Sequence, residues 1–328
     1  MFLAHLWVTR YGAPPELGFT GPRPSTNMSP RRGWKRSLWV LGQSRATPYA
    51  AVLACVVFNP FFAASRAQNA KTEPPARATE QSAINPNLPT IFVVGDSTAN
   101  NNANGARGWG DPFIEYFDAE KINVFNRARG GRSSRTFITE GLWDKVFSEM
   151  KKGDFVLIQF GHNDAGAIND ATRARGSLPG LGEETQEIDN LLTKKHEVVH
   201  TYGWYMRKMI AETKAKGATT IVLSLTVRNI WKEGRVERGP GKFGQWAAEV
   251  AKSQQVTFID VTKLIADRYE ELGEEKVKEL FATDHTHTSP AGAELNASFV
   301  VTGLKMLKDK PLDRYLSAKG KAVESSRQ

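Results

Sequence analysis

Short apolar runs alternate with longer amphipathic stretches between about residues 89 and 312. The apolar runs are rich in β-branched and aromatic side chains, and they comprise Thr90–Val94, Ile122–Phe125, Phe155–Phe160, Thr220–Leu225 and Val256–Ile259. Because these runs are continuous rather than alternating, we expect strands that are buried on both faces, as in a parallel sheet.

The stretches between the apolar runs have the spacing of amphipathic helices. Leu142, Val146 and Met150 repeat every four residues, and Ser289 followed by Pro290 is typical of a helix start. The predicted helices are Glu140–Met150, Val198–Ile210, Phe243–Val250, Leu264–Leu272 and Pro290–Leu307. Strands and helices in turn predict a three-layer α/β/α sandwich with a five-stranded parallel sheet and right-handed crossovers.

The first 67 residues differ in composition from the rest of the chain. They hold eight of the 44 basic residues and one acid, and so carry most of the net charge of +9. The basic cluster 31–36 precedes an apolar stretch, Tyr49–Ala64, and a small-residue site at 65–67, which is the order of an export signal. We expect export to the periplasm or the exterior, by the general route or, from Arg31-Arg32, the twin-arginine route. Met28 is an alternative translation start, in which case residues 1–27 would be an overextension of the sequence.

The remaining chain is nearly neutral, with 36 basic and 34 acidic residues, and this balance does not favour nucleic-acid binding. The sole cysteine, Cys55, lies within the apolar stretch, where a lipoprotein site is the less favoured alternative. No apolar run reaches the ~18 residues of a membrane span, so we expect none in the mature form. We predict a flexible linker at 68–88, one domain at 89–312 and a frayed tail at 313–328.

Polar segments that contain glycine follow the predicted strands. They occupy residues 95–98, 126–133 and 161–164, and a fourth, 283–290, precedes the last helix. Ligands of open α/β sheets bind beyond the carboxyl ends of the strands, so we expect these segments to meet at one edge.

These segments contain the groups that acyl transfer requires, namely a nucleophile, a base, an orienting carboxylate and oxyanion donors. Ser97 lies in a strand-to-helix turn, and Asp284 and His287 are three residues apart on one loop. The candidate oxyanion donors are the N–H groups of Ser97 and Gly131 and the side chain of Asn163. No single motif among these is specific, but their combination in chain order is.

A metal site is an alternative interpretation of two histidine-containing segments. Asp284–His287 packs a carboxylate and two imidazoles into four residues, and His285 is a rival base to His287. His196–His200 (HEVVH) matches a zincin helix with Glu197 as base. No further ligand follows at the expected spacing, so we favour serine chemistry with no metal and no cofactor.

Three residues are candidates for sugar contact: Arg132, His200 and Trp231. We expect Trp109, by contrast, to pack in the core. The polar segment Ala165–Lys195 directly follows the third predicted strand. Its length predicts a wall or lid over the site.

The combination Gly95–Ser97, Gly131, Gly161–Asp164 and Asp284-x-x-His287 resembles the SGNH (GDSL) hydrolase superfamily over about Thr90 to Leu307. Segments 91–98, 126–137, 162–166 and 284–297 resemble rhamnogalacturonan acetylesterases most closely.

The resemblance implies a flavodoxin-like fold, with Ser97 as nucleophile, His287 as base and Asp284 orienting it. Ser97, Gly131 and Asn163 would form the oxyanion hole. The resemblance also implies removal of acetyl groups from an acetylated polysaccharide or oligosaccharide, with rhamnogalacturonan as the expected substrate and without a cofactor.

Four other functions stay open at this point. An acetyl xylan esterase, lipase or thioesterase would use the same site, and a non-catalytic glycan-binding module would have a degraded triad. The chain lacks the Gly-x-Ser-x-Gly elbow at Ser97, which argues against the α/β-hydrolase family.

Overall fold

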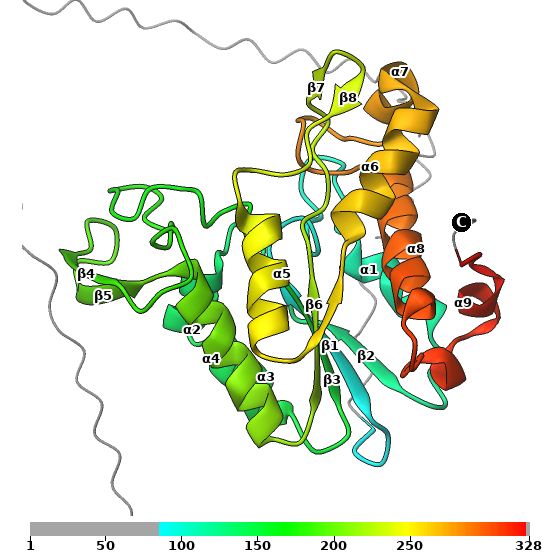
Figure 1. The fold of residues 1–328 in the computed structure, drawn as a ribbon, viewed down its shortest axis with the longest axis horizontal. Coiled ribbons are helices and arrows are strands. Elements are labelled where there is room, and N and C mark those ends of the chain that lie inside the picture. The colour runs from blue at the N-terminus through cyan, green and yellow to red at the C-terminus, as the bar shows by residue number, and fades with distance from the viewer. Residues whose placement is uncertain (1–84, 326–328) are drawn as a thin grey trace, which may run out of the picture. The chain divides into compact units, whose positions relative to one another are not determined.

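The computed structural model describes residues 85–325, and its centre is a five-stranded parallel sheet (Figure 1). The strands are β1 (Thr90–Gly95), β2 (Asn123–Asn126), β3 (Phe155–Gln159), β6 (Thr219–Leu223) and β9 (Thr257–Ile259). Their order is β2-β1-β3-β6-β9, and every neighbouring pair is parallel. This is the flavodoxin-like order of a doubly wound sheet, so the predicted fold class is confirmed. The predicted export signal and nearly all of the predicted linker lie outside the described residues.

Helices cover both faces of this sheet (Figure 1). One layer holds α2 (Ser134–Thr139), α3 (Leu142–Glu149), α4 (Tyr202–Ala215) and α5 (Phe243–Ser253). The other holds α1 (Gly110–Phe113), α6 (Val261–Leu272) and α8 (Pro290–Met306), with the short α7 (Glu274–Lys278) after α6.

The strand residues divide between two apolar cores. Phe92 and Val94 of β1 face the first layer, and Ile91 and Val93 face the second. All four side chains are fully buried, as expected for a strand covered on both faces. Within residues 85–325, no helix combines the length and the apolar character needed to cross a membrane.

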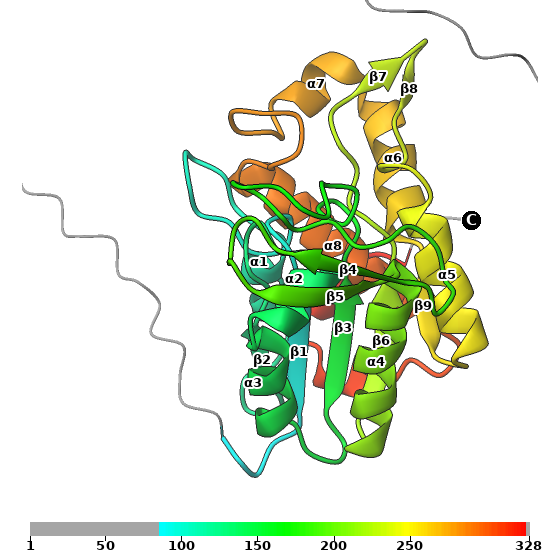
Figure 2. The same ribbon diagram turned by 90° about the vertical axis from the view of Figure 1, so that its left-hand side faces the viewer.

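The start of the predicted helix Val198–Ile210 is wrong. Residues His196–His200 form strand β5, which pairs antiparallel with β4 (Thr185–Asp189). Val199 is buried and Val198 is exposed, which is the alternation of a half-buried strand. Helix α4 begins after Thr201, whose hydroxyl accepts a hydrogen bond from the Trp204 N–H. The β4–β5 hairpin lies beside α2 and the beginning of α4 (Figure 2).

The prediction of a frayed tail is also wrong for most of its length. A 3₁₀ turn, η2 (Asp313–Tyr315), and helix α9 (Ala318–Ala322) follow α8. Leu316 is buried and forms an antiparallel bridge with Phe117, which follows the 3₁₀ turn η1 (Ile114–Tyr116). The domain therefore extends to about residue 322, because apolar side chains in the tail complete one of its two cores. A second small hairpin, β7 (Trp231–Lys232) with β8 (Arg235–Val236), was also not predicted.

Candidate active site

Ser97 lies in a tight turn at the carboxyl end of β1. The preceding Asp96 is fully buried, and its Oδ1 accepts hydrogen bonds of 2.8 Å from both the N–H and the hydroxyl of Thr98. The Asp96 carbonyl accepts two more, from the N–H groups of Ala99 and Asn100. The aspartate of the Gly-Asp-Ser motif therefore fixes the backbone of the turn, and Ser97 remains partly exposed.

A second segment holds this turn from the side of α1. The N–H groups of Trp109 and Gly110 donate to the carbonyls of Thr98 and Ala99 at 3.0 and 2.9 Å. A Cβ at Gly108 would lie 2.3 Å from the Ala99 carbonyl carbon, so only glycine permits this approach. Trp109 is fully buried and donates its indole N–H to Gln159 at 2.8 Å, which matches its expected place in the core.

The structure brings Ser97, His287 and Asp284 together. His287 Nε2 lies 2.9 Å from Ser97 Oγ, and His287 Nδ1 lies 2.7 Å from Asp284 Oδ2. Asp284 Oδ1 also accepts the N–H groups of Thr286 and His287. Burial works to raise the pKa of Asp284, but its bonds to the His287 ring and to these two N–H groups outweigh it and lower the pKa. An ionised Asp284 can only accept, so the Nδ1–H of His287 donates to it and the unprotonated Nε2 faces Ser97 Oγ as an acceptor.

The loop that carries the histidine is anchored on two sides. The Thr288 carbonyl accepts the Arg107 N–H, and the Thr288 hydroxyl donates to the Arg107 carbonyl, each at 2.8 Å. The carbonyl of His285 accepts the Asn229 N–H at 2.7 Å, while the residue itself is exposed. His287 is therefore the histidine of this loop whose ring meets Ser97.

The glycine turn that carries Gly131 borders the Ser97 turn, and Asn163 is hydrogen-bonded to this glycine turn. A Cβ at Gly130 would lie 3.7 Å from Ser97 Cβ, so the glycine turn packs directly against the serine. Gly131 has a φ of 78°, a conformation that favours glycine. Across the described part of the chain, the N–H groups of Ser97 and Gly131 have no protein acceptor, so both are available to a ligand oxygen. Asn163 is buried and donates one amide hydrogen to the Arg132 carbonyl at 2.8 Å, which leaves the other for a ligand.

Two buried titratable residues flank Asn163. Burial lowers the pKa of His162 to about 4, and its Nε2 lies 3.4 Å from the Thr226 hydroxyl. Burial raises the pKa of Asp164 to about 6, against hydrogen bonds from Ser134 and Ser177. Asp164 thereby joins the end of β3 to the first residue of α2, a structural role.

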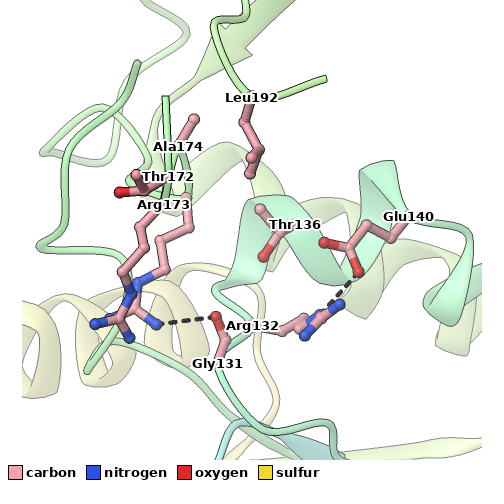
Figure 3. Close-up of a pocket in the computed structure, with 9 residues that line it drawn as sticks. Gly131, Arg132, Thr136, Glu140, Thr172, Arg173, Ala174 and Leu192 are labelled. Atoms are coloured by element: carbon pink, nitrogen blue, oxygen red, sulfur yellow. Dashed lines mark hydrogen bonds and ion pairs between the residues drawn. The ribbon is translucent and has the colours of Figure 1, made fainter. Parts of the chain in front are cut away.

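Of the three predicted sugar contacts, Arg132 lines a pocket of about 240 Å³ next to the glycine turn (Figure 3). His200 stacks on Trp204 with ring centroids 3.8 Å apart, at the end of the β4–β5 hairpin. Trp231 packs against one of the apolar cores and donates its indole N–H to Asn229. The contacts of His200 and Trp231 are therefore with neighbouring protein groups.

The zincin alternative is wrong because the HEVVH segment is a strand. Two residues four positions apart in a strand are separated by about 13 Å, too far for one metal ion. Glu197 instead forms a two-pronged ion pair with Arg135, with both N–O distances at 2.7 Å. Among residues 85–325, no group of three or more His, Cys, Asp or Glu side chains is arranged to hold a metal ion.

Arg135 is a residue that the sequence did not reveal. Its side chain is fully buried, and its Nη1 donates to the carbonyls of Ile168 and Gly176 at 2.7 Å each. One guanidinium therefore joins α2, the segment after β3 and strand β5. Part of that segment, residues 172–175, lines the pocket beside Gly131.

Comparison with known proteins assigns the family. Residues 93–295 match the GDSL-like Lipase/Acylhydrolase family. A rhamnogalacturonan acetylesterase of Emericella nidulans is 33% identical over 208 residues, 63% of this chain and 81% of that protein. The rhamnogalacturonan acetylesterase RhgT of Bacillus subtilis is 28% identical over 249 residues, 70% of this chain and 96% of that protein.

Among solved structures, the crystal structure of YxiM from Bacillus subtilis superposes with a TM-score of 0.52 at 25% identity. The match covers 66% of this chain and 56% of that one. The sheet order, the geometry at Ser97 and the family match agree, and the chain belongs to the GDSL-like lipase/acylhydrolase family of esterases.

Proposed function

We propose that this protein removes O-acetyl groups from an acetylated polysaccharide or oligosaccharide, with rhamnogalacturonan as the substrate, by a Ser-His-Asp acyl-enzyme mechanism. The observation that carries the mechanism is the position of His287, which bridges Ser97 Oγ and Asp284 Oδ2. Support for the substrate comes from the two relatives named as rhamnogalacturonan acetylesterases.

In the first half of the reaction, His287 Nε2 takes the proton of Ser97 as Oγ attacks the acetyl carbonyl carbon. The N–H groups of Ser97 and Gly131 and the Asn163 amide donate to the oxyanion that forms. The bond between the acetyl carbon and the sugar oxygen then breaks, and His287 gives its proton to that oxygen.

In the second half, His287 takes a proton from water, and the resulting hydroxide attacks the acetyl group on Ser97. The bond to Oγ breaks, His287 returns the proton to Ser97, and acetic acid leaves and loses its proton to water as acetate. Asp284 stays ionised throughout and stabilises the imidazolium that forms in each half.

We further infer from the sequence that residues 1–67 direct the protein out of the cytoplasm. A basic cluster, an apolar stretch and a small-residue site follow each other there in the order of an export signal. An exported esterase would meet a polysaccharide outside the cell.

The test is acetate release by the purified protein from acetylated rhamnogalacturonan, acetylated xylan and an aryl acetate, each with and without a chelator. We expect release from rhamnogalacturonan at the highest kcat/KM, unaffected by the chelator. Release from xylan or the aryl acetate alone would contradict the substrate, and loss of activity with the chelator would contradict the metal-free mechanism.

A further inference from the structure

The pocket next to the glycine turn is rich in guanidinium groups. Arg132, Arg173 and Arg175 all line it, and Glu140 is its one acidic lining residue (Figure 3). Gly131 also lines the pocket, and its carbonyl accepts a hydrogen bond from Arg175 Nη1 at 3.2 Å. The pocket is therefore adjacent to the groups that face the reacting ester.

Two of these three arginines have no carboxylate partner within the described residues. Glu140 pairs with Arg132 at 2.8 Å. Asp170, the acid nearest Arg173 in sequence, accepts hydrogen bonds from the N–H groups of Thr172 and Arg173 and from the Thr172 hydroxyl. The side chain of Arg173 is exposed, and that of Arg175 is half-buried.

The guanidinium groups of Arg173 and Arg175 are close enough to repel each other. The pKa of Arg175 is lowered by burial and, next, by the positive charge of Arg173, while the negative charges of Asp96 and Asp164 act in the opposite direction. An anion between them would remove this repulsion. A planar carboxylate suits the guanidinium fork, which can donate two parallel hydrogen bonds to it.

The segment that carries both arginines is held in place before any ligand binds. The N–H groups of Arg175 and Gly176 donate to the Ala167 carbonyl at 3.0 and 2.8 Å. A Cβ at Gly176 would lie 2.0 Å from the Gly166 carbonyl oxygen, so the two arms of this loop meet at a glycine. The buried Arg135 holds the Gly176 carbonyl from the other side. Because the backbone that carries the two arginines is already fixed, only their side chains have to be ordered when an anion binds.

We propose that Arg173 and Arg175 bind the carboxylate of a uronic acid residue of the glycan while its acetyl ester lies at Ser97. This inference rests on the proposed function, because it assigns a specificity contact to the same site. It makes the enzyme selective for acidic acetylated glycans over neutral ones. Leu192, 48% exposed, adds an apolar surface to the same pocket for the C–H face of a sugar.

The test compares two substrates that differ only in charge. One is an acetylated oligosaccharide that contains uronic acid, and the other is the same oligosaccharide with its carboxyl groups reduced to alcohols. The measured quantity is the ratio of kcat/KM for the acidic substrate to kcat/KM for the reduced one. Arg173→Gln should lower this ratio about 10- to 100-fold, the effect of one charge-assisted hydrogen bond.

Arg173 is the better probe of the two, because Arg175 also contacts the Gly131 carbonyl. Arg173→Lys keeps the charge but loses the fork, so its ratio should lie between those of wild type and Arg173→Gln. Arg268→Gln is the matched control, because it removes an arginine from an exposed ion pair on α6. Its ratio should equal that of wild type.

A direct binding measurement complements the kinetics. Titration of an unacetylated oligosaccharide of uronic acid into the protein should give a Kd that rises about 10- to 100-fold in Arg173→Gln. An unchanged substrate ratio in Arg173→Gln, or an equal fall of the ratio in Arg268→Gln, would overturn the carboxylate site while acetate release persists. Wild-type protein that releases acetate from neither substrate would instead overturn the proposed function, and the inference with it.

Discussion

Asn163 donates its side-chain amide to the backbone carbonyl of Arg132 at 2.8 Å, and this bond joins the end of β3 to the turn that carries Gly131. The same amide has a second hydrogen for an oxyanion. Asn163→Ala should therefore remove one oxyanion donor and also release the turn. We expect kcat to fall about 10²- to 10³-fold, with a smaller change in KM. Steady-state acetate release checks this, and a loss of less than tenfold would reject the oxyanion role.

The two histidines of the 283–290 loop should differ sharply in their contribution to activity. His287→Ala removes the base and should lower kcat by about 10³-fold or more. His285→Ala keeps the carbonyl that accepts the Asn229 N–H, and it should retain most of the activity. The two variants are compared on one aryl acetate. Retained activity in His287→Ala together with loss in His285→Ala would reverse the assignment.

Arg135 should be among the residues most sensitive to substitution. Arg135→Met leaves Glu197 without its cation and leaves the Ile168 and Gly176 carbonyls without a donor. Breaking a buried ion pair from one side costs about 3–5 kcal/mol, so we expect the free energy of unfolding to fall by that amount. Urea denaturation measures it.

Arg135→Lys is the control for charge, because it keeps the cation but cannot make all four hydrogen bonds. Its loss of stability should be smaller than that of Arg135→Met. If both variants unfold within about 1 kcal/mol of wild type, the guanidinium does not hold the three segments together.

Local spacing predicted the sheet, whereas the groups around Ser97 followed from the rule that strand ends meet at one edge and from the family resemblance. Each of the five predicted strands overlaps an observed strand of the sheet, and Asp284 lies on the same short loop as His287. The errors concern long-range pairing. Val198 and Val199 fit a helical stripe, but β4 pairs with them and makes them part of a hairpin.

The Arg135–Glu197 pair spans 62 positions and appears in no motif, so only the fold reveals it. The same holds for Leu316, which lies in a mostly polar stretch of sequence yet forms a β-bridge with Phe117. The pocket arginines are similar. Arg173 and Arg175 lie in a segment of polar composition. Only the folded loop shows that both line a pocket beside Gly131.

His162 and Asp164 should give the stability of the domain opposite responses to pH. The pKa of His162 is lowered from 6.5 to about 4 by burial, so its contribution is present above pH 6.5 and is lost as the pH falls through 4. The pKa of Asp164 is raised from 3.8 to about 6 by burial, so its contribution is present below pH 3.8 and is lost as the pH rises through 6.

Paired variants separate these two effects. From pH 7 to pH 4.5, the unfolding free energy of His162→Gln should rise by roughly 2 kcal/mol relative to that of wild type, because the variant has no buried histidine to protonate. Over the same pH change, the unfolding free energy of Asp164→Asn should fall by a similar amount relative to wild type, because it has no buried carboxyl group to protonate. Urea denaturation at both pH values measures the change, and shifts of the same sign in the two variants would contradict this account.

The central claim is that Ser97, activated by His287, attacks the acetyl ester. Its most direct test is the initial rate of acetate release from acetylated rhamnogalacturonan by wild type and by Ser97→Ala, with equal secondary structure confirmed by circular dichroism. The account predicts that Ser97→Ala loses turnover by about 10⁴-fold or more. A Ser97→Ala variant that keeps more than a tenth of the wild-type rate would contradict it.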